Sequence, residues 1–255
     1  MKNVWIIARK ELRTYFTAPI AYVVIIVFSV IIGFFFWSIL MWFNNQSMQM
    51  AQNQYYYSQI NINQMVYQPL FNNMSLILLF MLPGLTMRLF SEEKKIGTEE
   101  LLFTSPISVW QILFGKFVAA LFVLLGMLGL TAILSVFAFL YGNPEVVPIL
   151  IGYFGLFLIG AAFIAIGIFF SSLTKNQTIA AELTFGALLF FWVINWASNF
   201  AEGFWKDVLN YLSFFQHFNN MTLGILDTID VIYYLSFVIL GLFLTHWVIQ
   251  SRWRR

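Results

Sequence analysis

The sequence has no cysteine and very little charge. Its 255 residues include 13 Lys and Arg and 11 Asp and Glu, so only 9% of the chain is charged. Soluble domains usually carry about 25% charged residues, so this composition argues against a cytosolic globular protein. It also argues against a disordered chain, because 61% of the residues are hydrophobic and disorder needs low hydrophobicity. Without cysteine, the chain has no disulfides, no thiolate nucleophile and no thiolate metal ligand.

The chain also lacks the motifs of nucleotide and metal chemistry. Its only Gly-Lys pair, Gly115-Lys116, is followed by Phe117, whereas a phosphate-binding loop needs Ser or Thr there and further glycines at fixed spacing. The two histidines, His217 and His246, are far apart in the sequence, unlike those of a zinc site or a catalytic triad. A net charge of +2 provides no basic field for nucleic acid. We therefore expect no enzyme activity, no catalytic, cofactor-binding or metal-binding residues, and no nucleic-acid partner.

Long hydrophobic runs dominate the sequence instead. A helix that crosses the hydrocarbon core of a bilayer needs about 20 mostly apolar residues, and six segments meet or approach this length. They are residues 20–43, 72–89, 112–141, 146–173, 178–197 and 231–250. The sequence therefore predicts an all-α integral membrane protein with six transmembrane helices in one domain, residues 20–250.

Two connections are too long to be simple turns. Residues 44–71 are uncharged and rich in Asn, Gln and Tyr, which predicts a solvated outer loop with some helix of its own. Residues 199–230 alternate polar stretches with apolar runs that are each too short to span. We expect re-entrant or interfacial helices on the outer face there.

The basic residues are distributed unevenly between the two sides of the predicted membrane domain. With six alternating spans, Lys206 alone falls on the outer side. The other twelve lie on or next to the opposite side: Lys2, Arg9, Lys10, Arg13, Arg88, Lys94, Lys95, Lys116, Lys175, Arg252, Arg254 and Arg255. Because Lys and Arg concentrate in cytoplasmic loops, we expect both termini, including the tail 251–255, to be cytoplasmic.

Residues 1–19 read as an amphipathic segment that ends at Pro19. On a helical projection, one arc holds apolar side chains: Val4, Trp5, Ala8, Leu12, Tyr15 and Phe16. The neighbouring arc holds Lys2, Arg9, Lys10 and Arg13, and Glu11 completes the charged set. The pattern predicts an elbow helix in the membrane interface, with basic groups toward anionic head groups. A plain positive anchor is the alternative.

Residues 91–108 form the main cytoplasmic loop in this topology. Its six charges are Glu92, Glu93, Lys94, Lys95, Glu99 and Glu100, and they are interrupted by Ile96, Leu101, Leu102 and Phe103. Gly97 followed by Thr98 resembles a helix break and a new N-cap, with two acids in the next first turn. A short charged helix with an apolar ridge would suit docking of a soluble partner, whereas an ordinary solvated loop is the alternative.

Two charges lie inside predicted spans, and both are near the cytoplasmic ends. Lys116 could snorkel toward the head groups. Glu182 could pair with Lys116 or Lys175. Alternatively, Lys116 and Glu182 could line an inner vestibule. Ion-coupled carriers usually have ionisable groups deep in the bilayer, and the middle of most spans here has none. The pairs Ala161/Ala165 and Gly167/Ser171 have the small-residue spacing of close helix packing.

Three segments resemble a known family. They are IARKELRTYFTAPIAYV near the N-terminus, FSEEKKIGTEELLFTSPIS after the second span, and LSFFQHFNNMTLGILDTIDVIYYLS before the sixth. Together with the order of elbow helix, six spans and outer half-helices, they resemble an ABC-2 type exporter permease. The chain is most similar to the permease subunit associated with bacterial gliding motility. The outer segment 44–71 is longer than a minimal connection of that family.

The resemblance implies an assembly. Such a permease lies in the bacterial cytoplasmic membrane and pairs with a second permease, identical or related. Two cytosolic ABC ATPases dock beneath the pair, and they bind the ATP and Mg. The positions carried over as ATPase-coupling residues are Glu92, Glu93, Lys94, Lys95, Gly97, Thr98, Glu99, Glu100, Leu101 and Leu102. Two alternatives remain, namely an ion-coupled carrier or channel, and a non-transporting membrane anchor of a motility machine.

Overall fold

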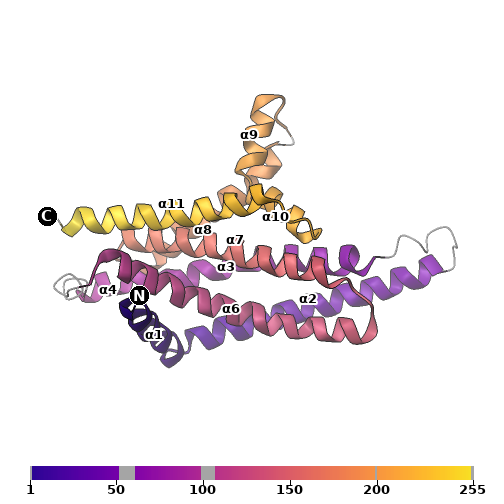
Figure 1. The fold of residues 1–255 in the computed structure, drawn as a ribbon, viewed down its shortest axis with the longest axis horizontal. Coiled ribbons are helices and arrows are strands. Elements are labelled where there is room, and N and C mark those ends of the chain that lie inside the picture. Colours follow the sequence, from indigo (N-terminus) through magenta and orange to yellow (C-terminus); the bar gives the residue numbers. More distant parts are fainter. Residues whose placement is uncertain (1, 52–60, 99–106, 199, 254–255) are drawn as a thin grey trace.

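The computed structural model describes residues 2–51, 61–98, 107–198 and 200–253, and this part of the chain is built from helices (Figure 1). The elements are α1 (Lys2–Thr17), α2 (Ile20–Ala51), the π-helical turn η2 (Asn63–Tyr67), α3 (Gln68–Thr86), α4 (Arg88–Ile96), α6 (Val109–Tyr141), α7 (Val146–Leu173), α8 (Gln177–Ser198), α9 (Phe204–Leu212), α10 (Phe214–Thr222) and α11 (Thr228–Trp253).

Six of these helical stretches are long and apolar enough to cross a membrane. They are Ile20–Gln49, Asn63–Ile96, Val109–Leu140, Val146–Leu173, Gln177–Ser198 and Thr228–Ser251. This confirms the predicted all-α fold class with six spans. The long helices run side by side, and both ends of the chain lie at the same end of the bundle as α4 (Figure 1).

Local sequence signals explain where several helices begin and end. Pro19 separates α1 from α2, because proline has no N–H for an intrahelical bond and its ring clashes with the preceding turn. Ser108 begins α6 with a capping box, in which its side chain accepts from the N–H of Gln111 and the Gln111 side chain accepts from the N–H of Ser108.

The first two spans are longer than the sequence predicted. Helix α2 continues to Ala51, and the second span starts at Asn63 and runs through α3 and α4 to Ile96. The expected solvated loop over 44–71 is therefore largely helical in the residues described, and 52–60 lie outside them. The physical reason is that 44–51 contain neither Gly nor Pro, so nothing there stops the helix.

Helix α7 is the centre of the bundle. Helices α3, α6, α8, α10 and α11 all pack against it, and 72% of its apolar window is buried, compared with 17% for α2. Small residues allow this close packing: a Cβ at Gly167 would overlap Thr86 of α3, and a Cβ at Gly241 of α11 would lie 3.0 Å from the carbonyl carbon and oxygen of Ala165. Small residues thus bring the helix backbones into contact.

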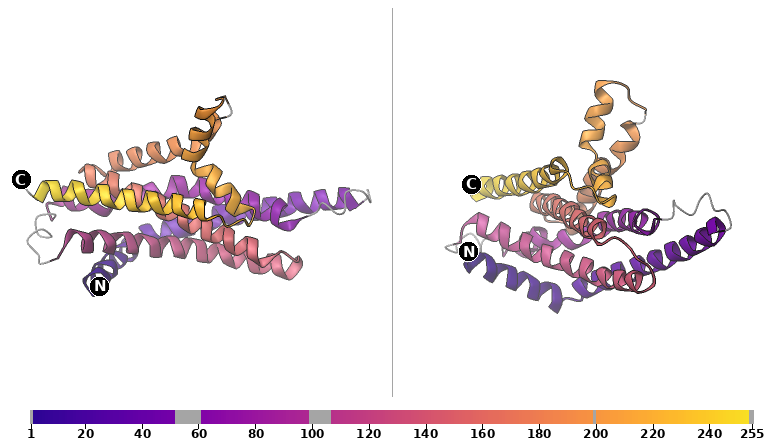
Figure 2. Two further views of the ribbon diagram at one scale, coloured as in Figure 1. Left: turned by 45° about the horizontal axis from the view of Figure 1, so that its top comes forward. Right: turned by 45° about the vertical axis from the view of Figure 1, so that its right-hand side comes forward.

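The segment expected to form outer half-helices contains α9 and α10, each nine residues long. Helix α9 projects away from the bundle (Figure 2), and it has no buried residue. In contrast, α10 is fixed to the start of α11, because Nδ1 of His217 lies 2.6 Å from Oδ1 of Asp230 and Asn220 donates to the other oxygen at 3.1 Å. The last residues of α9 are held as well, since the hydroxyl of Tyr233 donates to the carbonyl of Leu212 at 2.7 Å.

We predict that the methyl group added by Gly241→Ala costs about 1–3 kcal/mol of overpacking, because it meets the backbone of Ala165, and that the higher helix propensity of alanine offsets only part of this cost. Gly186→Ala in α8 is the matched control, since no atom lies within 4 Å of its added Cβ. Alanine is the better helix former by about 1 kcal/mol, so the control should be neutral or stabilising. Thermal unfolding in detergent measures both. Equal stabilisation by the two variants would contradict the assigned packing.

Candidate functional site

Helix α4 carries the first half of the charged segment, and it lies beside α1 at the end of the bundle where both termini are found (Figure 1). It ends at Gly97, whose φ of 79° is left-handed, a conformation that glycine adopts without strain. The N–H of Thr98 then donates to the carbonyl of Glu93 at 3.0 Å. The structure therefore has the helix break predicted at Gly97.

The second half of the charged segment lies outside the described residues. This applies to the expected first turn after Thr98 and to four of the coupling positions, namely Glu99, Glu100, Leu101 and Leu102. What can be built from the structure is thus the site around α4.

Lys116, near the start of α6, is the hub of this site. Its ammonium lies 3.0 Å from Oε1 of Glu11 on α1, 2.8 Å from Oε1 of Glu93 on α4, and 2.7 Å from the carbonyl oxygen of Leu89. The residue is only 1% exposed. An ammonium has three N–H donors, so all three are used, and the charge of one lysine joins three helices.

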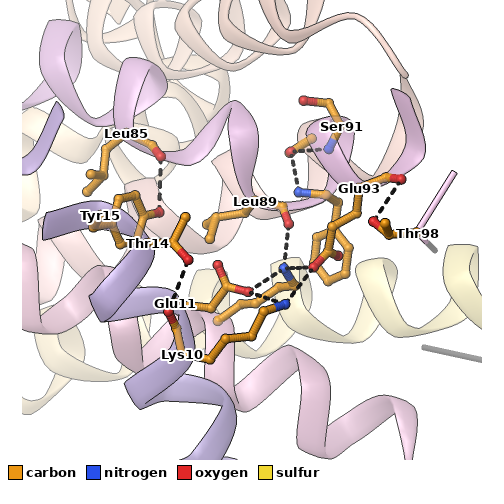
Figure 3. Close-up of polar contacts among 12 residues, drawn as sticks. Lys10, Glu11, Thr14, Tyr15, Leu85, Leu89, Ser91, Glu93 and Thr98 are labelled. Atoms are coloured by element: carbon orange, nitrogen blue, oxygen red, sulfur yellow. Dashed lines mark hydrogen bonds and ion pairs between the residues drawn. The ribbon is translucent and has the colours of Figure 1, made fainter. Parts of the chain in front are cut away.

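Neighbouring groups complete the electrostatics of this hub (Figure 3). Nζ of Lys10 lies 3.7 Å from the same oxygens of Glu11 and Glu93, so two ammonium groups balance two carboxylates. Nζ of Lys116 also lies 5.0 Å from the centre of the Phe90 ring, a favourable cation–π contact. A buried charge is costly unless it is paired and hydrogen-bonded, and here both conditions are met.

The expected behaviour of Lys116 is therefore wrong in two respects. It does not snorkel, because it is buried, and its ion pairs in the described structure are with Glu11 and Glu93 rather than with Glu182. Helix α1 packs against α6 and supplies one of the two carboxylates, while α4 supplies the other. Glu182 and Lys175 are both exposed. That Glu182 lines an inner vestibule stays a prediction.

Helix α1 packs along α6 through a stripe that shares Ala8 and Tyr15 with the predicted apolar arc and adds Ile7 and Glu11. Its buried residues are Ile7, Ala8, Glu11 and Tyr15. The expected apolar arc is only partly correct, because Trp5 is 56% exposed and Phe16 40%. The basic residues Arg9, Lys10 and Arg13 are exposed, as an interfacial elbow helix requires.

Tyr15 links this elbow helix to the second span. Its hydroxyl donates to the carbonyl of Leu85, near the end of α3, at 3.1 Å. Burial raises the pKa of the Tyr15 phenol, and the carboxylate of Glu11 raises it further. The phenol therefore stays protonated at neutral pH and remains a donor.

The charged residues of α4 point in different directions. Glu93 faces the hub, and buried Lys94 donates to the carbonyl of Ser172 at the end of α7. Glu92 pairs with Arg88 one turn earlier, with Nε and Oε2 3.0 Å apart. Lys95 is exposed. Of the four charged residues from Glu92 to Lys95, Glu93 and Lys94 thus hold α4 against other helices.

Comparison with known proteins identifies the family. The sequence matches the family model described as ABC-2 family transporter protein over residues 5–249, nearly the whole chain. The chain belongs to the ABC-2 transporter family. None of the curated proteins matches this ABC-2 permease. Membrane subunits of the family are transport proteins that generally have no catalytic activity, and they normally work with a cytosolic ABC ATPase.

The role of Glu11 and the partners of Lys116 in this ABC-2 permease were not predicted from the sequence. A signal was present, since Ile7, Glu11 and Tyr15 are four residues apart and form one helical stripe. An acid in that stripe needs a cation on the helix it packs against. Lys116 was the available cation, because it lies near the predicted cytoplasmic end of the third span, on the same side of the membrane as the elbow helix.

We predict that Lys116→Met destabilises the ABC-2 permease by about 3–5 kcal/mol, because it leaves the buried carboxylate of Glu11 and the partly buried carboxylate of Glu93 without their main counterion. Lys95→Met, at an exposed position, should change stability by less than about 0.5 kcal/mol. Adding Glu11→Gln and Glu93→Gln to Lys116→Met should recover part of the loss, since neutral groups are cheaper to bury. Thermal unfolding followed by tryptophan fluorescence measures all three. The hub assignment fails if the triple variant is less stable than Lys116→Met.

Proposed function

We propose that this ABC-2 permease is the membrane subunit of an ATP-driven exporter, and that a cytosolic ABC ATPase docks on the end of the bundle formed by α1 and α4. The observation that carries the proposal is the buried Lys116 hub. It fixes a short charged helix to the elbow helix and to the third span. A push on α4 would therefore reach both.

The distribution of charge supports a cytoplasmic location for this end. Both termini lie there (Figure 1), as do the basic residues of α1 and α4, namely Lys2, Arg9, Lys10, Arg13, Arg88, Lys94 and Lys95. In the proposed orientation they follow the positive-inside rule. Exposed Lys95 and Ile96 would contact the ATPase directly. That Glu99, Glu100, Leu101 and Leu102 also take part in coupling is proposed from the family resemblance alone.

We further propose that the permease works beside a second permease, identical or related. The chemistry of ATP and Mg would belong to the ATPase, since this chain lacks the phosphate-binding loop. The apolar windows of α2 and α8 are only 17% and 22% buried, so these helices have the most surface available for a second permease within the membrane.

We also propose a role in gliding motility. It is supported by the resemblance of the three sequence segments to the permease subunit associated with bacterial gliding. We predict that deleting the gene in the source bacterium abolishes surface gliding and that the wild-type copy restores it. Time-lapse microscopy of cells on a surface measures this. Normal gliding in the deletion strain would overturn this role and leave the exporter proposal standing.

The docking proposal predicts a position-specific cross-link. Because the chain has no cysteine, Ile96→Cys introduces a single thiol at a position that is 66% exposed at the end of α4. We expect it to cross-link to a co-expressed ABC ATPase through a short thiol–amine reagent. The matched control is Met48→Cys on α2, which is 62% exposed near the far end of the bundle (Figure 1), and it should not react with the ATPase. A cross-link from position 48 alone would reverse the proposed orientation.

A further inference from the structure

The junction between the second span and the charged helix has an unusual hydrogen-bond arrangement. Helix α3 ends at Thr86, Met87 is a turn, and α4 begins at Arg88. In an unbroken helix, the N–H of Phe90 would donate to the carbonyl of Thr86. Where a helix starts anew, its first N–H groups need other acceptors. Met87 stands at the N-cap position and makes no side-chain cap.

The acceptor comes from another span. Oγ of Ser171, near the end of α7, lies 3.0 Å from the backbone nitrogen of Phe90 and 3.2 Å from that of Ser91, and it accepts from both. The same hydroxyl donates to the carbonyl of Met87 at 2.8 Å. A serine hydroxyl has one donor and two acceptor lone pairs. Ser171 uses all of them on the first turn of α4.

The environment makes these bonds matter. Ser171 and Ser91 are both fully buried, so water does not replace a lost acceptor, and an unpaired buried N–H is costly. One turn further along α4, Lys94 donates to the backbone carbonyl of Ser172. Helix α4 is thus hydrogen-bonded to the end of α7 in two successive turns.

We propose that Ser171 is a positioning residue for energy coupling, because its hydroxyl acts as the N-cap of α4 from the neighbouring span. This rests on the proposed function, in which an ATPase pushes on α4. With the cap in place, α4 cannot pivot at Met87 without breaking three hydrogen bonds. Its displacement is therefore passed to α7, on which five other helices pack.

The cap is tested by amide hydrogen exchange of the full chain in nanodiscs, resolved to single residues. Ser171→Ala removes the hydroxyl, and Ser171→Cys keeps the volume but supplies only a weak acceptor. Both variants should speed exchange at Phe90 and Ser91 by about fivefold, as expected for a lost helix cap. Ser172→Ala is the matched control, since its buried hydroxyl bonds only the carbonyl of Phe169 in its own helix, and it should leave these amides unchanged.

The positioning role is tested in the complex with the ATPase. Addition of ATP and vanadate should change exchange in the α7–α8 turn, residues 174–176, of the wild type, and Ser171→Ala should lose most of that change while the ATPase stays bound. Unchanged exchange at Phe90 and Ser91 in both Ser171 variants, or an equal effect of Ser172→Ala, overturns the cap. Faster exchange there with an intact vanadate response overturns the role in coupling. If no ATPase binds even the wild type, the proposed function fails, whereas the exchange at Phe90 still decides the cap.

Discussion

The arrangement at one end of this protein depends on a single buried ammonium group. Lys116 is almost inaccessible to solvent, and a charge in such a place is stable only with counterions and hydrogen bonds around it. The acceptors come from the elbow helix, from α4 and from the backbone of Leu89. Moving any one of these away would leave charge uncompensated, so the elements at this end are constrained to move together.

The rest of the bundle depends on close packing rather than on charge. Helix α7 presents small residues to its neighbours, and the backbones of α7 and α11 come together where Gly241 meets Ala165. In a membrane, helices gain little from hydrophobic burial against one another, so close van der Waals contact becomes important. The polar contacts of Ser171 and Ser172 lie at the end of this same helix. The charged helix α4 is thus attached to the most rigidly packed element of the fold.

The sequence was sufficient for features that depend on local or one-dimensional signals. The six spans follow from hydrophobic length, and the breaks at Pro19 and Gly97 follow from backbone chemistry. The extent of α2 was missed because a polar helix without Gly or Pro resembles a loop in composition. The contacts of Ser171 were missed because they join residues far apart in the chain, and no local pattern encodes them. The partners of Lys116 were missed because the stripe of Ile7, Glu11 and Tyr15 indicates that Glu11 needs a cation, but not which helix supplies it.

In a chain with few charged residues, the charges on α4 have a different role from those of a soluble helix. In a soluble protein, a run such as Glu92 to Lys95 is usually solvated. In this chain, Glu93 and Lys94 instead face the protein and carry contacts between helices, because ionic contacts become stronger where water is excluded. Under the proposed function, the surface left for the ATPase is therefore small on α4 itself and centres on Lys95 and Ile96. The inward charges would then transmit the force that the outward ones receive, so the same short segment would serve both docking and transmission.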